Sequence, residues 1–130
     1  MISVDTNVFM YAVGRDHPHK ARAREFFAAT LGDPQARLVT SVEVMQELMH
    51  AYVPVERLKT LDAALELVAR TTVEAWSLEK DDVVEARSLA TAMPALGARD
   101  LLHLACCRRR GIQRIQTFDR ALKVAFESSI

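Results

Sequence analysis

Short apolar runs alternate along this chain with longer segments in which hydrophobic residues recur at helical spacing. Four runs bounded by polar residues predict strands: 2–4, 37–40, 72–76 and 114–118. Six segments with apolar positions three or four residues apart predict helices: 19–31, 42–52, 58–68, 81–93, 99–110 and 121–126. Thr40 and Ser41 lie where they cap the second helix, and Gly111 lies where it ends the fifth. Residues 5–7 are interpreted as a polar turn after the first strand.

This alternation of strands and helices indicates one fold class. Helices of about ten or more residues between strands act as crossover connections, so the sheet should be mostly parallel and covered by helices on both faces. The 130 residues suit one domain, and no linker, repeat or low-complexity tract divides them. We therefore expect a single α/β domain over residues 1–130.

Composition and charge narrow the class of protein. Half of the residues are hydrophobic and 26% are charged, which is ordinary for a globular fold. Seventeen Lys and Arg balance seventeen Asp and Glu, which excludes a globally basic nucleic-acid binder. The balance is uneven locally, because residues 101–130 hold six basic and two acidic side chains.

The chain also carries signals of its compartment. Its first residues lack the basic and long apolar segments of a secretory signal, and no stretch approaches the ~20 apolar residues of a membrane span. Cys106 and Cys107 are adjacent in an apolar run, where we expect core residues rather than a disulfide or a metal site. We expect a cytoplasmic protein with no membrane contact.

Four acidic residues are expected near one edge of the predicted sheet. Asp5 and Asp119 follow strands, Asp100 opens a helix, and Glu47 lies within a largely apolar helix. In open parallel sheets, sites form beyond the carboxyl ends of the strands. Each acid alone has an ordinary explanation as a turn residue, a helix cap or a solvated side chain. Glu43, one helical turn before Glu47, competes with it for a place in the site.

Together, the four carboxylates favour a metal site. Apolar neighbours penalise unpaired anions, and oxygen ligands suit Mg²⁺ or Mn²⁺ rather than zinc. A divalent ion beside a phosphodiester activates water and stabilises the leaving oxygen. Hydrolysis of a phosphodiester is therefore the expected chemistry.

Four motifs follow one another along nearly the whole chain. They are Val4-Asp5-Thr6-Asn7-Val8, Ser41 followed by Glu47-Leu48, Arg99-Asp100-Leu101-Leu102-His103-Leu104-Ala105, and Thr117-Phe118-Asp119. In this order and spacing they resemble the PIN domain family, particularly the small VapC-type toxins of bacterial and archaeal toxin–antitoxin pairs. The resemblance implies a three-layer α/β/α sandwich with a parallel sheet of about five strands. It also implies a Mg²⁺- or Mn²⁺-dependent endoribonuclease whose partners are an RNA substrate, a cognate antitoxin and, in a homodimer, a second copy of the chain.

The resemblance also implies roles for individual residues. Asp5 and Asp100 match the principal metal ligands, Glu47 a ligand that acts directly or through water, and Asp119 a member that often acts through water. Glu47 is preferred to Glu43 because Glu47-Leu48 matches the family's pattern. Polar residues that match supporting positions around these acids are Thr6, Asn7, Ser41 and Thr117.

Most of the basic side chains near these motifs have two interpretations. His103, one turn after Asp100, is either a satisfied structural group or a group that hydrogen-bonds a metal-bound water or an RNA phosphate. Arginines interpreted as RNA contacts are Arg99, Arg108, Arg109 and Arg110. The last three also fit a solvated helix end that complements the helix dipole.

Large apolar side chains are expected mainly in the core, with some available for self-association or an antitoxin: Phe26, Phe27, Met45, Met49 and Tyr52.

Alternative functions stay open on the sequence. A catalytically silent PIN-fold module that binds RNA or protein would keep the same fold, although an incomplete acidic set would suit it better. A phosphatase of the haloacid-dehalogenase type requires a second Asp two residues after Asp5, where Asn7 stands. A receiver domain requires a phosphorylatable Asp after a middle strand and a later Lys, and neither is visible.

Overall fold

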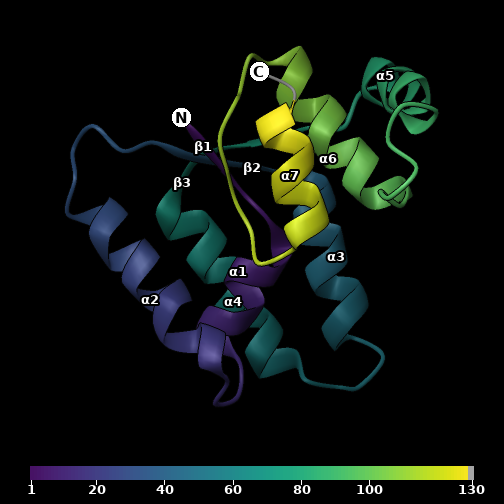
Figure 1. Cartoon of the computed structure of the whole chain (residues 1–130). Coiled ribbons are helices and arrows are strands. Elements are labelled where there is room, and N and C mark those ends of the chain that lie inside the picture. The colour runs from purple at the N-terminus through teal and green to yellow at the C-terminus, as the bar shows by residue number, and fades with distance from the viewer. Residues whose placement is uncertain (129–130) are drawn as a thin grey trace.

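Four short strands form one parallel sheet in the computed structural model, which describes residues 1–128 (Figure 1). The strands are β1 (Ile2–Val4), β2 (Leu38–Ser41), β3 (Thr72–Trp76) and β4 (Ile115–Gln116). Their order is β3-β2-β1-β4, and every neighbouring pair is parallel. The expected parallel sheet is confirmed, with four strands in this part of the chain instead of about five.

Seven helices lie between and after these strands in residues 1–128. They are α1 (Thr6–Val13), α2 (Pro18–Leu31), α3 (Val42–Tyr52), α4 (Leu58–Thr71), α5 (Lys80–Ala90), α6 (Ala98–Arg109) and α7 (Arg120–Ser128). Helices α1 to α4 contact one another, and α6 contacts both α5 and α7. The helices therefore form two groups (Figure 1).

The strands separate these two groups because alternate side chains of a strand point to opposite faces of the sheet. Val4 and Leu38 belong to a core cluster with residues of α1 to α4. Val39 and Trp76 belong to a second cluster with residues of α5 to α7. One cluster on each face makes the expected three-layer α/β/α sandwich, which is confirmed.

The segment expected to be a polar turn instead begins helix α1. Asp5 caps this helix, since its Oδ1 accepts the backbone N–H of Thr6 at 2.7 Å. Val8, Phe9 and Ala12 then bury one side of the helix. A helix of eight residues is too short to show clear helical periodicity in its sequence. The signal that could have predicted it was an Asp cap followed by apolar positions four residues apart.

The last strand is shorter than the predicted 114–118. It spans Ile115–Gln116, and the next residue, Thr117, donates its hydroxyl to Asp5 at 2.7 Å. There the backbone N–H of Phe118 donates to the side-chain oxygen of Asn7 at 3.1 Å, a bond outside the strand ladder.

Other local predictions have mixed outcomes. Gly111 follows α6 with φ +71°, as its predicted role in ending that helix requires. Cys106 and Cys107 are buried free thiols, which confirms them as core residues. Met49 is half exposed, so its placement in the core was wrong. No helix within residues 1–128 has the length and apolar character needed to cross a membrane.

Candidate active site

The topology creates a crevice beside β1. The chain runs outward from β1 to β2 and β3 and then returns to place β4 on the other side of β1. Such a reversal of strand order opens a binding crevice at the carboxyl ends of the strands. Asp5 follows β1 and Asp119 follows β4, so both stand at this crevice.

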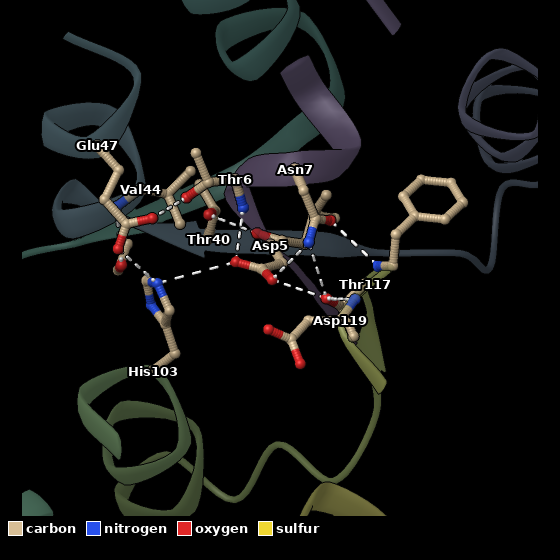
Figure 2. A network of polar contacts seen from close by, with 12 residues as sticks. Asp5, Thr6, Asn7, Thr40, Val44, Glu47, His103, Thr117 and Asp119 are labelled. Atoms are coloured by element: carbon tan, nitrogen blue, oxygen red, sulfur yellow. Dashed lines mark hydrogen bonds and ion pairs between the residues drawn. The ribbon is translucent and has the colours of Figure 1, made fainter. Parts of the chain in front are cut away.

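Helices α3 and α6 bring the other two acids to the same place. Asp5, Glu47, Asp100 and Asp119 all line one pocket of about 320 Å³. Figure 2 shows Asp5 at its centre, with Glu47 and His103 on one side and Thr117 and Asp119 on the other. Four elements that are distant in sequence thus contribute one carboxylate each.

Asp5 is held by hydrogen bonds to both of its oxygens. Oδ1 accepts the N–H of Thr6 at 2.7 Å, and Oδ2 accepts the hydroxyl of Thr117 at 2.7 Å and the amide of Asn7 at 3.3 Å. The Asn7 amide also reaches the Thr117 hydroxyl at 3.3 Å. Burial raises the pKa of Asp5, and the charge of His103, followed by the bonds from Thr117 and Thr6, only partly offsets that effect. The orientation of the carboxylate is therefore set before any ligand binds.

Glu47 is held from two sides. The Thr6 hydroxyl donates to Oε2, and His103 Nε2 lies 3.0 Å from Oε1. Burial raises the pKa of Glu47, but the hydrogen bond and charge of His103 lower it by more, so this carboxyl is ionised. Because a carboxylate only accepts, the bonding proton lies on Nε2 of His103.

His103 is a buried member of the site. Its Nε2 lies 3.8 Å from Asp5 Oδ1 as well as 3.0 Å from Glu47. Burial lowers the pKa of His103, but the bond to Glu47 and the charge of Asp5 raise it by a larger amount. The net shift is therefore upward. The imidazole is therefore hydrogen-bonded to Glu47 and within ion-pair distance of Asp5.

Asp100 and Asp119 complete the acidic wall of the pocket. Asp100 makes no side-chain hydrogen bond or ion pair with residues 1–128, and its pKa is raised by burial and then by the charges of Asp119 and Asp5. Asp119 Oδ1 accepts the N–H of Leu122 at 3.1 Å, so this acid also caps α7, as its ordinary interpretation held.

The donor set of the pocket suits a hard divalent cation. Asp5, Glu47 and His103 have side-chain N or O atoms within 4.8 Å of one another, and because His103 Nε2 carries the proton bonded to Glu47, the carboxylates are the candidate ligands. Asp100 adds a carboxylate that no cation of residues 1–128 pairs with, and mutual repulsion among the acids is a cost that a bound cation removes. With four carboxylates against one imidazole, oxygen ligands predominate, as Mg²⁺ and Mn²⁺ require.

Two residues assigned to the site act at its edge or behind it. Ser41 is buried, and its hydroxyl accepts the N–H of Val44 at 3.4 Å, so it caps the helix that carries Glu47. Arg99 lines the pocket. Its charge lowers the pKa of Glu47, although by less than His103 and the Thr6 bond do, and against the upward effect of burial.

Two of the arginines interpreted as RNA contacts are paired with a buried carboxylate. Arg109 and Arg110 both donate to the buried Asp82, at 2.7 Å and 2.8 Å. They and Arg108 lie at the opposite end of α6 from Arg99, about 15 Å along the helix. Arg109 and Arg110 hold α5 against α6, and Arg108 is exposed.

Sequence reasoning missed three side chains that line the pocket: Met10, His50 and Ala51. Met10 comes from α1, and His50 lies one turn after Glu47 on α3. The spacing of three residues from Glu47 was a signal for His50. Met10 had none, because α1 itself was not expected. Glu43 is absent from the lining, which agrees with the preference for Glu47.

Comparison with known proteins agrees with this geometry. The family model for the PIN domain matches residues 2–126. Ribonuclease VapC23 of Mycobacterium tuberculosis is 62% identical over 128 residues, which cover 98% of this chain and all of the relative. Ribonuclease VapC13 of the same organism is 38% identical over 120 residues, 92% of this chain and 91% of the relative.

A solved structure supports the same assignment of the fold. The crystal structure of Mycobacterium tuberculosis VapC20, a sarcin-ricin loop cleaving toxin, matches with a TM-score of 0.74 at 21% identity and covers 96% of this chain and 95% of that one. The three comparisons agree over nearly the whole chain. This protein therefore belongs to the PIN domain family.

Proposed function

We propose that this protein is a Mg²⁺- or Mn²⁺-dependent endoribonuclease and the toxin component of a type II toxin–antitoxin pair. The observation that carries the proposal is the convergence of four carboxylates on one pocket. The chain's relatives include proteins named as VapC ribonucleases at up to 62% identity, which supports the same activity here.

The four acids are the residues that would hold the ion: Asp5, Glu47, Asp100 and Asp119. A divalent ion supplies Lewis-acid activation of water and neutralises charge at the scissile phosphate. The reaction joins the oxygen of water to phosphorus and breaks the bond to the sugar oxygen in line, and that oxygen leaves with a proton.

The chain's own contribution is positioning. Thr117 and the Thr6 N–H fix the two oxygens of Asp5, while the Thr6 hydroxyl and His103 fix those of Glu47. Arg99, at the rim, draws the phosphate backbone toward an otherwise acidic pocket. These groups leave little reorganisation for the moment of reaction.

Partners follow from this activity. The substrate is RNA, which places the activity in the cytoplasm, and the inhibitor is a cognate antitoxin. The homodimer stays a prediction, and sedimentation of the purified chain alone and with the product of an adjacent small reading frame tests both partners.

Asp100→Asn is the sharpest test. The side chain makes no bond within residues 1–128, so the variant should keep the melting temperature of the unsubstituted protein while losing cleavage of a structured RNA by more than about a hundredfold. Asp62→Asn, an exposed acid on α4, is the matched control and should keep full activity. Both are assayed with Mg²⁺, with Mn²⁺ and with a chelator.

Equal cleavage by Asp100→Asn and Asp62→Asn would overturn the proposal. So would activity that survives exhaustive removal of divalent ions, because it would show that the acidic pocket is not the catalytic centre.

A further inference from the structure

A second groove, of about 520 Å³, adjoins the carboxylate pocket. Asn7 and Met10 line both hollows, so a ligand that leaves the pocket on this side enters the groove. The other lining side chains are mostly aromatic or cationic: Tyr11, Arg15, Asp16, His17, Tyr52 and Arg57. None of them belongs to the acidic site described above.

The aromatic wall is supported from behind. The ring centroids of the exposed His17 and Tyr11 lie 4.4 Å apart. The rings of Tyr11 and Phe118 meet edge to face, with centroids 5.2 Å apart. Phe118 directly precedes Asp119, so the ring cluster is tied to the acidic pocket. Aromatic faces of this kind stack on the splayed bases of single-stranded RNA.

His17 is also held in one orientation. It caps α2, with Nδ1 accepting the N–H of His19 at 3.0 Å. Nδ1 is then an acceptor, and Nε2 is left as the donor on the solvent side. A fixed ring costs less entropy to stack against than a mobile one.

Arginine supplies the charge in this groove. The guanidinium of Arg57 lies over the ring of Tyr52, 6.0 Å from its centroid. Neither Arg57 nor Arg15 forms an ion pair with any residue in 1–128, in contrast to Arg109 and Arg110. The one carboxylate of the groove is Asp16, so two cations face one anion. This surplus complements a phosphate backbone.

The turn that presents Arg57 has an unusual conformation. Glu56 has φ +58°, which is uncommon for a residue other than glycine. The next N–H, that of Arg57, donates to the carbonyl of Tyr52 at 3.0 Å and closes the turn. Backbone in such a conformation is enriched at functional sites.

We propose that this groove is a substrate subsite that holds one nucleotide of single-stranded RNA beside the scissile phosphate. The base stacks on the exposed ring of His17, which itself packs against Tyr11, and its phosphate pairs with Arg57. The volume falls within the range of small-ligand pockets. The role of this nucleotide as substrate rests on the ribonuclease proposed above, but its binding can be measured separately.

Binding is measured on the full chain carrying Asp100→Asn, so that the RNA is not cut. Two fluorescent probes are compared by anisotropy over a range of KCl concentrations: an unstructured RNA of ten nucleotides and a strand of ten abasic ribose phosphates. The probes share their charge and differ in their bases. The ratio of their Kd values therefore isolates stacking.

His17→Asn and Arg57→Gln are added separately to this protein. Asn is a good N-cap, so His17→Asn removes the ring and keeps the cap of α2. It should weaken binding of the RNA probe but not of the abasic strand. The ratio of the abasic Kd to the RNA Kd should therefore fall by about fivefold or more. Arg57→Gln should weaken the binding of both probes alike. It should also reduce the slope of log affinity against log salt concentration by about 0.7. Arg87→Gln, an exposed arginine on α5, should change neither.

The outcomes separate the two proposals. If His17→Asn and Arg57→Gln bind both probes as Arg87→Gln does, the subsite is overturned, even where the unsubstituted protein cleaves RNA. If they show the expected losses but the unsubstituted protein cleaves no RNA with Mg²⁺, the subsite stands and the ribonuclease proposal falls. If no variant binds RNA, the subsite falls, and cleavage by the unsubstituted protein decides the ribonuclease proposal.

Discussion

Replacing Asp82 with Ala should destabilise the protein strongly without touching the acidic pocket. Asp82 has no exposed surface and accepts hydrogen bonds from Arg109 at 2.7 Å and from Arg110 at 2.8 Å and 3.1 Å. Its Oδ2 also accepts the N–H of Glu79 at 2.8 Å, which closes the capping box of α5. One side chain thus joins the start of α5 to the end of α6.

The magnitude follows from what the substitution leaves behind. Removing one partner of a buried ion pair costs about 3–5 kcal/mol, and losing a helix cap costs about 1 kcal/mol. The arginine side chains are 29% and 16% exposed, so water can solvate them in the variant and reduce the cost. We expect a loss of about 2–4 kcal/mol, which for a domain of this size lowers Tm by about 6–15 °C.

Urea and thermal unfolding followed by circular dichroism measure this loss. The matched control is Asp81→Ala, because Asp81 is the neighbouring acid, is 75% exposed and lies 3.7 Å from Arg109. Its removal should cost less than about 0.5 kcal/mol. Equal unfolding free energies for the two variants would refute the reasoning, since they would show that the buried pairs contribute no more than a surface one.

Three further predictions use the same measurements or the RNA assay. Burial raises the pKa of Asp82, but bonds from Arg110, the Glu79 N–H and Arg109 lower it by more, so the folded pKa lies below the unfolded one. The stability that the ionised Asp82 contributes is therefore present above about pH 4 and lost as the pH falls further. In urea melts at acid pH, the free energy of unfolding should decline more steeply for the unsubstituted protein than for Asp82→Ala. Thr117→Val removes the hydroxyl donor to Asp5 and should reduce RNA cleavage by about 10- to 100-fold at unchanged Tm, with Thr117→Ser retaining activity. Gly111→Ala should cost about 1–2 kcal/mol in urea, because φ is +71° and no steric contact adds to the backbone penalty.

Much of the fold could be predicted because its signals are local. Helix α3 and strand β3 begin and end where the pattern placed them, since Ser41 supplies a cap and apolar spacing covers each whole element. Helix α1 was missed because its first two residues, Thr6 and Asn7, belong to a polar triplet typical of a turn. The short β4 was overestimated because Thr117, at its end, bonds to Asp5 across the sheet, and periodicity carries no information on such a bond.

The acids of the site could be predicted more readily than the contacts that position them. Asp5, Asp100 and Asp119 are marked by their places at the ends of strands or the start of a helix. The bond between His103 and Glu47 joins residues 56 positions apart, and it depends on how α3 and α6 approach across the sheet edge. Spacing from Asp100 placed His103 on the right face of α6, but it could not identify the partner.

Counts of charge along the chain have the same limit, because they do not distinguish paired from free cations. The basic run at the end of α6 draws attention as an RNA contact, yet Arg109 and Arg110 are paired with three acidic residues at the start of α5: Glu79, Asp81 and Asp82. Arg15 and Arg57, both outside any basic run, form no ion pair in residues 1–128 and stand beside the pocket. The acids at the start of α5 therefore offset the charge of the basic run at the end of α6. The attraction for a phosphate chain is left to arginines that the three-dimensional fold collects from separate segments.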